Sequence, residues 1–332
     1  MGEGKLQPEA RQKLECVDLS SDDEHKLAAQ IRQACLESGF FYVVNHGIDL
    51  QFINEVFKHS KRFFSLPLEE KMKVLQDKNN RGYTPYAEEM LDPDKQSRGD
   101  SKEGYYIGVE ILETDTRAKK PLHGPNLWPS SSLLPGWREI MEKYFEESLI
   151  LSRKLIKLLA LALYLDESYF NKPGMLDDPM AALRLLHYSA ERSIPELGIL
   201  GAGAHCDYGM LTLLATDSVP GLQICRQKDA TPQIWEDVLP LEGAYVVNLG
   251  AMLERWSNGL FRATLHRVAN PGKERYSIAF FMEPNFDCLV ECLPTCHSDI
   301  NPPKYPPMIS GHYLLGRYIV THNGFDSNAK SS

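Results

Sequence analysis

Two histidines and an aspartate are the residues of this 332-residue chain whose types and spacing best fit metal chemistry. His205 and Asp207 flank a single residue in the segment GAHCDYGMLTLLATD, directly before an apolar run. Residues i and i+2 of a strand project from the same face, so this pair can hold one ion at a strand end. His266, in RATLHRVANP, lies 59 residues after Asp207 and is the best third ligand. Two imidazoles and one carboxylate on one face of a non-haem iron leave positions open for substrate and O₂.

A second pair of polar residues follows on an apolar strand. Arg275 and Ser277, in RYSIAF, lie on one strand face beginning nine residues after His266. The guanidinium fork and the hydroxyl together can hold a carboxylate. Because an unpaired buried charge is costly, Arg275 needs a partner. That partner is either an internal acidic residue or a small dicarboxylate ligand, and the strand alone leaves both open.

Taken together, these residues occur in the order and spacing of a known motif. His205-Cys206-Asp207, His266 and Arg275-Tyr276-Ser277 match the H-x-D…H…R-x-S pattern. The chain thereby resembles the Fe(II)/2-oxoglutarate-dependent dioxygenase superfamily, in the branch of isopenicillin N synthase and the plant 2-oxoglutarate oxygenases. The flanking segments HCDYGMLTLLATDSVPGLQI, VVNLGAMLERWSNGLFRATLHRVANP and GFFYVVNHGI resemble the same branch. The likeness spans residues 17–285, so it covers a whole domain rather than a stray motif.

The resemblance implies a fold, a cofactor and a reaction. The fold would be mainly β with flanking helices, with a double-stranded β-helix (a jelly roll, or cupin-like) core. The chain would oxidise a C–H bond of a small molecule with O₂, most simply by hydroxylation, and release succinate and CO₂, with ascorbate as a reductant. This branch also points to plant-type specialised metabolism. The family pattern would place Fe(II) on His205, Asp207 and His266, and 2-oxoglutarate on Arg275, Ser277 and Tyr188.

Three positions depart from the family pattern. Leu186 stands where plant members commonly carry an asparagine, two residues before Tyr188. Ala251 replaces the common aspartate after the NLG turn, and Cys206 replaces a threonine between the two ligands. We expect the side chain of Cys206 to point away from the metal and to serve packing.

The substrate is harder to read from the sequence. Arg184, if it points inward, favours a carboxylate on the substrate, whereas an internal ion pair is the alternative. Our candidates for the lining of the substrate pocket are Arg184, Tyr106, Tyr83 and Phe281, with Tyr86, His187 and Met282 beside them.

The first half of the chain must supply helices around short strands. Apolar residues at helical spacing predict a helix over 22–38, capped by Ser20 or Ser21 and ended by Gly39. We expect further helices over about 50–64 and from Ser65 onward, then a long amphipathic helix over 134–165. The segments FFYVVNHGI and GYYIGVEI read as strands.

The second half changes to short runs separated by turn signals, which predict a sandwich, jelly roll or barrel over residues 181–285. We therefore expect an N-terminal helical and mixed region (1–165), a dioxygenase core (166–300) and a C-terminal tail (301–332) with a short helix near 313–319. Together these parts should form one compact unit.

The composition of the chain argues against nucleic acids and membranes as binding partners. The formal net charge is −9 and the pI about 5.6, so no basic face favours nucleic acid. No apolar stretch is long enough to span a membrane, and the start of the chain lacks a secretory signal. Seven cysteines, an odd number, favour reduced thiols in the cytoplasm. We read Cys288, Cys292 and Cys296 as structural, and the protein as a monomer.

Two alternatives to this reading remain open. An oxidase of the isopenicillin N synthase type, or an ethylene-forming enzyme, shares H-x-D…H…R-x-S without the ordinary use of 2-oxoglutarate. A cupin-like binding protein could keep the fold without catalysis. Intact ligands and an intact Arg/Ser pair argue against the second alternative.

Overall fold

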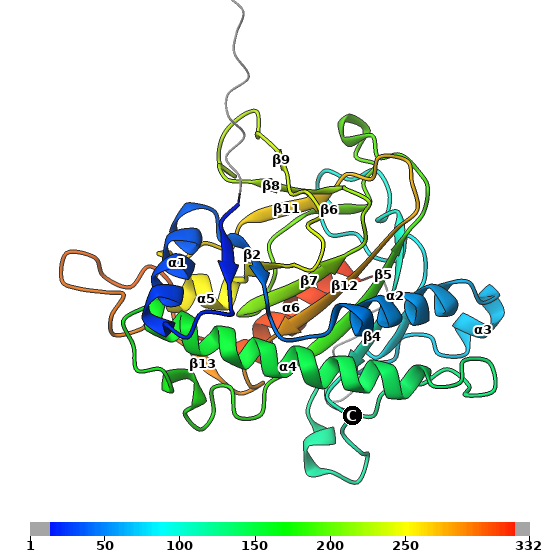
Figure 1. Cartoon of the computed structure of the whole chain (residues 1–332), viewed down its shortest axis with the longest axis horizontal. Coiled ribbons are helices and arrows are strands. Elements are labelled where there is room, and N and C mark those ends of the chain that lie inside the picture. Colours follow the sequence, from blue (N-terminus) through cyan, green and yellow to red (C-terminus); the bar gives the residue numbers. More distant parts are fainter. Residues whose placement is uncertain (1–13, 323–332) are drawn as a thin grey trace, which may run out of the picture.

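The computed structural model describes residues 14–322 and has two facing β-sheets wrapped on one side by helices (Figure 1). The larger sheet has eight strands in the order β1-β2-β10-β7-β12-β5-β4-β3, and the smaller has four in the order β6-β11-β8-β9. Neighbours in these orders are mostly far apart in sequence, as a double-stranded β-helix requires. The predicted fold class is therefore confirmed.

The strand bounds place most of the polar candidates on regular elements. The larger sheet is made of β1 (Cys16–Asp18), β2 (Phe40–Val44), β3 (Gly82–Thr84), β4 (Lys102–Gly108), β5 (Ala182–Tyr188), β7 (Leu211–Thr216), β10 (Tyr245–Leu249) and β12 (Arg275–Met282). The smaller sheet is made of β6 (Ala202–His205), β8 (Leu222–Cys225), β9 (Glu236–Asp237) and β11 (Leu265–Val268). A separate pair, β13 (Leu289–Val290) and β14 (Met308–Ile309), lies near the end of the chain. The larger sheet thus takes strands from both halves of the chain.

The α-helices of residues 14–322 are α1 (Glu24–Glu37), α2 (Leu50–Phe64), α3 (Leu68–Met72), α4 (Trp137–Ala162), α5 (Ala251–Trp256) and α6 (Ser310–Thr321). The long α4, green in Figure 1, packs on α1, α2, β7 and β12. The carboxylate of Asp23 caps α1 by accepting from the amide of Lys26, so the predicted serine cap is wrong. The first helix therefore begins later than its apolar pattern suggested.

The strand β12 divides the interior into two compartments. The side chains of Ile278, Phe280 and Met282 point toward the helices and belong to the main apolar core. Arg275, Ser277, Ala279 and Phe281 alternate with them and line a cavity between the two sheets. The core that stabilises the fold and the cavity that could hold ligands thus lie on opposite faces of one strand.

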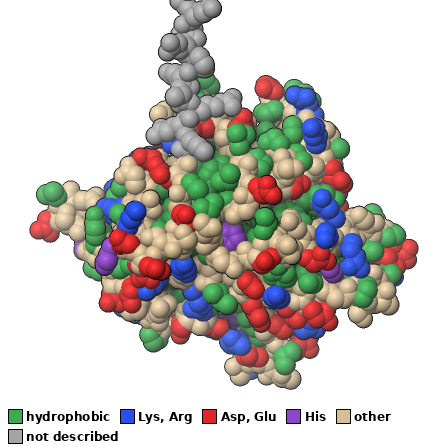
Figure 2. All heavy atoms as spheres, viewed as in Figure 1, with side chains coloured by type: hydrophobic (Ala, Val, Ile, Leu, Met, Phe, Trp, Pro, Cys, Tyr) green, Lys and Arg blue, Asp and Glu red, His purple; other side chains and the backbone are tan. Residues whose placement is uncertain are grey.

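The surface of the described residues mixes charges of both signs. Acidic and basic side chains are interspersed across the face in Figure 2. Among the helices of residues 14–322, none combines the length and apolar character needed to cross a bilayer. The cysteines within this range are all free thiols, and Cys288 and Cys296 are buried.

Candidate active site

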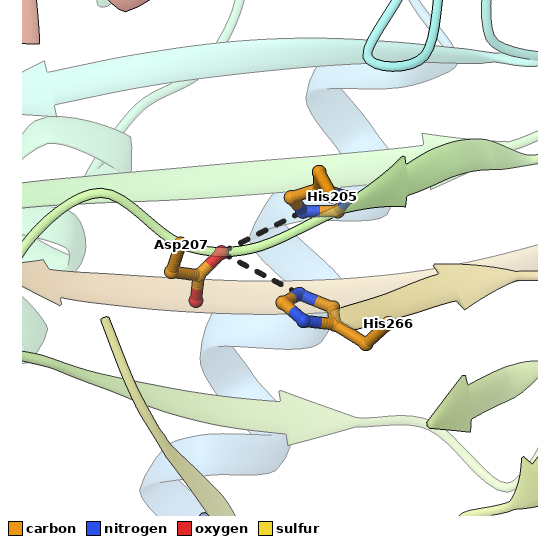
Figure 3. Close-up of side chains that lie close together, drawn as sticks. All are labelled: His205, Asp207 and His266. Atoms are coloured by element: carbon orange, nitrogen blue, oxygen red, sulfur yellow. Dashed lines mark ion pairs between the residues drawn. The ribbon is translucent and has the colours of Figure 1, made fainter. Parts of the chain in front are cut away.

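The side chains of His205, Asp207 and His266 all line the cavity, and they point toward one another (Figure 3). The Nε2 atoms of His205 and His266 lie 3.5 and 3.4 Å from the same Oδ1 of Asp207. The register explains the meeting, because His266 on β11 is paired directly with His205 at the end of β6. Bonds of about 2.1 Å from one ion to nitrogen and oxygen ligands would place these atoms about 3 Å apart. The donor set therefore fits a metal, and in the described part of the chain this is the one such cluster.

Hydrogen bonds fix the orientation of each of these side chains. The Nδ1 atoms of His205 and His266 face the carbonyls of Gly203 and Thr264 at 2.8 and 3.0 Å, so Nε2 is left to bind a metal. The other carboxylate oxygen of Asp207 accepts from the Thr212 hydroxyl and, at 2.6 Å, from the Asn248 amide. Thr212 and Asn248 were missed at the sequence level, although Asn248 lies in the quoted VVNLG segment.

The charge state of Asp207 suits a cation. Burial alone would raise the pKa of its carboxyl, but the charges and hydrogen bonds of His266 and His205 hold that pKa well below its usual range. Asp207 is thus a carboxylate whose free oxygen faces two imidazoles.

The residues next to the triad support its backbone. The amide of Ala251, the first residue of α5, donates to the carbonyl of Asp207 at 2.8 Å. The thiol of Cys206 donates to the carbonyl of Ala263 at 3.2 Å, away from the triad. Burial raises the pKa of Cys206 to about 12, so it is an unreactive thiol.

Arg275 lies further along the same cavity and has no carboxylate partner among the described residues. The residue is 1% exposed, and its guanidinium donates through Nε to the carbonyl of Val219 at 3.2 Å. Its Nη1 and the hydroxyl of Ser277 are fully buried without a hydrogen bond to any described residue. The guanidinium also lies 4.8 Å over the ring of Tyr188. The positive charge of Arg275 and these two unbonded donors fit a carboxylate that comes from outside the protein, such as the one 2-oxoglutarate would provide.

Arg184 lines the cavity but is already paired. Its two Nη atoms donate to the two oxygens of Glu89 at 3.2 and 2.8 Å. The guanidinium is therefore taken by an internal carboxylate, and the sequence-based expectation that it would favour a substrate carboxylate is not supported by this geometry. Glu89 gave no signal in the sequence, because it lies in a loop 95 residues before its partner.

The other substrate-pocket candidates divide by strand face. Phe281 lines the cavity, whereas Tyr106 does not reach it and supports Arg184, whose guanidinium lies 4.4 Å over its ring. Tyr83 differs from the prediction: its hydroxyl bonds Glu103 and its ring contacts Phe63 under the helices. The remaining candidates also lie elsewhere: His187 stacks on Tyr276, Met282 is in the helix-covered core, and Tyr86 is exposed.

Comparison with known families accounts for most of the chain. Residues 14–131 match the family described as non-haem dioxygenase in morphine synthesis N-terminal, and residues 180–284 match the 2OG-Fe(II) oxygenase superfamily. Azadirone synthase LFS of Melia azedarach is 48% identical over 306 residues, covering 92% of each chain. This chain belongs to the 2OG-Fe(II) oxygenase superfamily.

Further members of the superfamily agree with this assignment. Kihadalactone A synthase LFS of Citrus sinensis is 46% identical, covering 92% of this chain and 91% of its own. Among solved structures, a full-length Neurospora crassa protein in complex with alpha-KG is similar with a TM-score of 0.80 and 33% identity, covering 92% of this chain and 95% of that one. The chain is accordingly an oxidoreductase that uses Fe(II), 2-oxoglutarate and O₂ on a small molecule. The relatives support this reading over a 2-oxoglutarate-independent oxidase.

Proposed function

We propose that this oxygenase hydroxylates a C–H bond of its small-molecule substrate, with iron held by His205, Asp207 and His266 and 2-oxoglutarate held by Arg275 and Ser277. The observation that carries the assignment is the pair of orphaned donors, Arg275 Nη1 and Ser277 Oγ, in the cavity that contains the triad. In the described residues no carboxylate pairs with Arg275, so a dicarboxylate cosubstrate supplies what the fold leaves out.

Each side chain has a separate task in this scheme. Bound iron and 2-oxoglutarate supply the oxidising power, with succinate and CO₂ as by-products. The chain holds the imidazoles of His205 and His266 with the proton on Nδ1, so that each Nε2 lone pair faces the metal site. It keeps Asp207 ionised, and Thr212 and Asn248 fix the orientation of that carboxylate. Tyr188 packs under Arg275 and keeps the guanidinium pointing along the cavity. The apolar wall that includes Leu186 and Phe281 keeps bulk water from the reacting atoms.

We also propose the setting in which the enzyme works. The two plant relatives named as synthases support a role in specialised metabolism. Free thiols on all the described cysteines support a cytoplasmic location. We propose that the protein is a monomer and that residues 166–300 form its catalytic core. Ascorbate is the proposed reductant that maintains Fe(II).

The test uses the visible absorption of an iron–keto-acid complex. Fe(II) and then 2-oxoglutarate are added to the metal-free protein without air, and we expect a charge-transfer band that depends on both. Ser277→Ala should weaken the 2-oxoglutarate dependence, whereas Cys206→Ser, whose side chain points away from the triad, serves as the matched control. Iron binding without a band would favour the oxidase alternative, and no iron binding would refute the proposal.

The substrate is identified by its ability to stimulate succinate release. Candidate metabolites are added to the loaded enzyme in air, and stimulated succinate release is measured together with the oxidised product. A product that has gained one oxygen atom supports hydroxylation, whereas a product that has lost two hydrogens would replace it by desaturation.

A further inference from the structure

A buried group of four charged side chains closes one side of the cavity. It consists of Glu89 and Asp100 in the loop between β3 and β4, Lys102 at the start of β4, and Arg184 on β5. None is more than 5% exposed, and Lys102 and Arg184 both line the cavity. Because β4 and β5 are neighbours in the larger sheet (Figure 1), the group forms part of the wall opposite the smaller sheet. The charges of this group therefore decide what kind of molecule that wall can receive.

Glu89 is the centre of the group. Its Oε1 accepts from Nη1 of Arg184 and its Oε2 from Nη2. The same Oε2 lies 2.7 Å from Nζ of Lys102. Asp100 forms a second ion pair with Lys102 and also accepts from the amide of Gly203 at 2.8 Å. Two cations are thus matched by two carboxylates at contact distance.

The side chain of Arg184 has little freedom to leave this arrangement. The ring of Tyr106 supports the guanidinium from one side at 4.4 Å. On β4 a glycine, Gly104, makes room for it, since a Cβ there would lie only 3.3 Å from Nε of Arg184. Arg184 is therefore held against β4 and away from the centre of the cavity.

The charges of the group cancel. Burial would raise the pKa of Glu89, but Arg184 and Lys102 outweigh it and hold that pKa well below its usual range. Burial would lower the pKa of Lys102, but Asp100 and Glu89 raise it. His322 lies 3.4 Å from Glu89, and burial lowers its pKa to about 4, so it adds no charge at neutral pH.

The position of Arg184 assigns this wall to the substrate rather than to the cosubstrate. Tyr188 is paired with Arg275 in the sheet, whereas Arg184 is paired with Ala279, four residues further along β12. Four residues of strand span about 13 Å. The remaining lining around Arg184 is apolar, from Leu91, Leu186, Ala279 and Phe281.

We propose that Glu89 is a specificity-determining residue, which neutralises Arg184 and restricts this site to a substrate that is uncharged where it meets the wall. This inference rests on the proposed function, because it concerns the substrate of the same site. A carboxylate on the substrate would lose its water beside Glu89, and both described cations of the wall are already paired. An uncharged molecule gains burial against the apolar lining without that cost.

The test compares two probes of one shape, cyclohexanecarboxylate and cyclohexanecarboxamide. Each is titrated into the wild-type enzyme loaded with Fe(II) and 2-oxoglutarate without air, and binding is followed by calorimetry and by the visible band. We expect the amide to bind about tenfold more tightly than the carboxylate. In Glu89→Gln, which frees Arg184, the affinity for the carboxylate should rise about tenfold, and the double variant Glu89→Gln/Arg184→Gln should return to the wild-type preference.

A second variant keeps the inference falsifiable if Glu89→Gln does not fold. Arg184→Gln leaves Glu89 paired with Lys102, so it should not weaken carboxylate binding relative to the wild type. A loss of carboxylate affinity in Arg184→Gln, a wild-type preference for the carboxylate, or no binding of the amide would each overturn the inference. A missing visible band in the wild type would instead refute the proposed function, so the two failures are distinguishable.

Discussion

Two buried arginines on neighbouring strands of the larger sheet are held in opposite ways. Arg184 on β5 has its charge matched inside the protein by Glu89. Arg275 on β12 is as well buried, yet no described carboxylate pairs with it, and this is the difference, since each guanidinium has one buried nitrogen without a hydrogen bond to the described residues. Burial costs both side chains their hydration, but only one is compensated by the fold itself. The difference separates a residue that shapes the cavity from a residue that requires a ligand.

The largest expected effect comes from removing a metal ligand, because the carboxylate bound at Arg275 matters only when iron is held beside it. His205→Ala takes away one of the three candidate ligands, so succinate production should fall to the background rate. The measurement is succinate release in air with the best substrate found, or with 2-oxoglutarate alone. Turnover near that of the wild type would show that the triad is not the iron site.

The stability of the ligand-free protein should distinguish the two arginines directly. Arg184→Met leaves Lys102 as the one cation shared by the buried carboxylates of Glu89 and Asp100, so the free energy of unfolding should fall by about 3 kcal/mol. Arg275→Met removes a buried cation without a described carboxylate partner, so it should cost little or even stabilise. Urea unfolding without iron or 2-oxoglutarate measures both variants. Equal losses in the two would mean that Arg275 is compensated within the protein after all.

Cosubstrate affinity should show the reverse order. Arg275→Met should raise the KM for 2-oxoglutarate by about a hundredfold, since truncating one side of a buried charge pair typically costs about 2–5 kcal/mol. Fe(II) affinity should stay nearly unchanged, and Arg184→Met should leave the KM for 2-oxoglutarate within a few-fold of the wild type. If iron binding collapsed together with 2-oxoglutarate binding in Arg275→Met, the assigned roles would be wrong.

The smallest effect concerns the pH dependence of the Glu89 group. Burial lowers the pKa of His322 from 6.5 to about 4, so between these values the unfolded chain binds a proton that the folded protein does not. Stability should therefore fall as the pH drops from 6.5 toward 4. His322→Gln should move the acid-unfolding midpoint down by a fraction of a pH unit, as monitored by circular dichroism. An unchanged midpoint would indicate that His322 is not buried in neutral form.

The sequence was most informative where chemistry follows strand periodicity. His205 with Asp207, and Arg275 with Ser277, lie two residues apart, and alternation alone places each pair on one face. His266 was the best third ligand by its place in the β-rich half, and the family pattern then supplied Tyr188; both lie in the same cavity. The long helix was also predictable, because its apolar stripe runs over many turns.

Contacts between distant segments were not predictable in the same way. Tyr83 and Tyr106 looked equivalent as aromatic residues, but Tyr83 is paired with Tyr105, on the helix-covered face, and Tyr106 with Arg184 on the cavity side. Which face a residue takes depends on the pairing register, and a shift of one residue reverses it. The pairing of Glu89 with Arg184 likewise depends on a loop whose path has no periodic signal.

The central place of β12 has a consequence for how this enzyme can change. Both edges of β12 are hydrogen-bonded, to β5 and to β7, and its outward residues belong to the main core. Its amides should be among the slowest in the molecule to exchange with solvent. A substitution on this strand that retunes the cavity also disturbs the packing under the helices. New selectivity is therefore easier to evolve or engineer in the loop that carries Glu89 and Leu91, where Leu91 lines the cavity from outside the sheet.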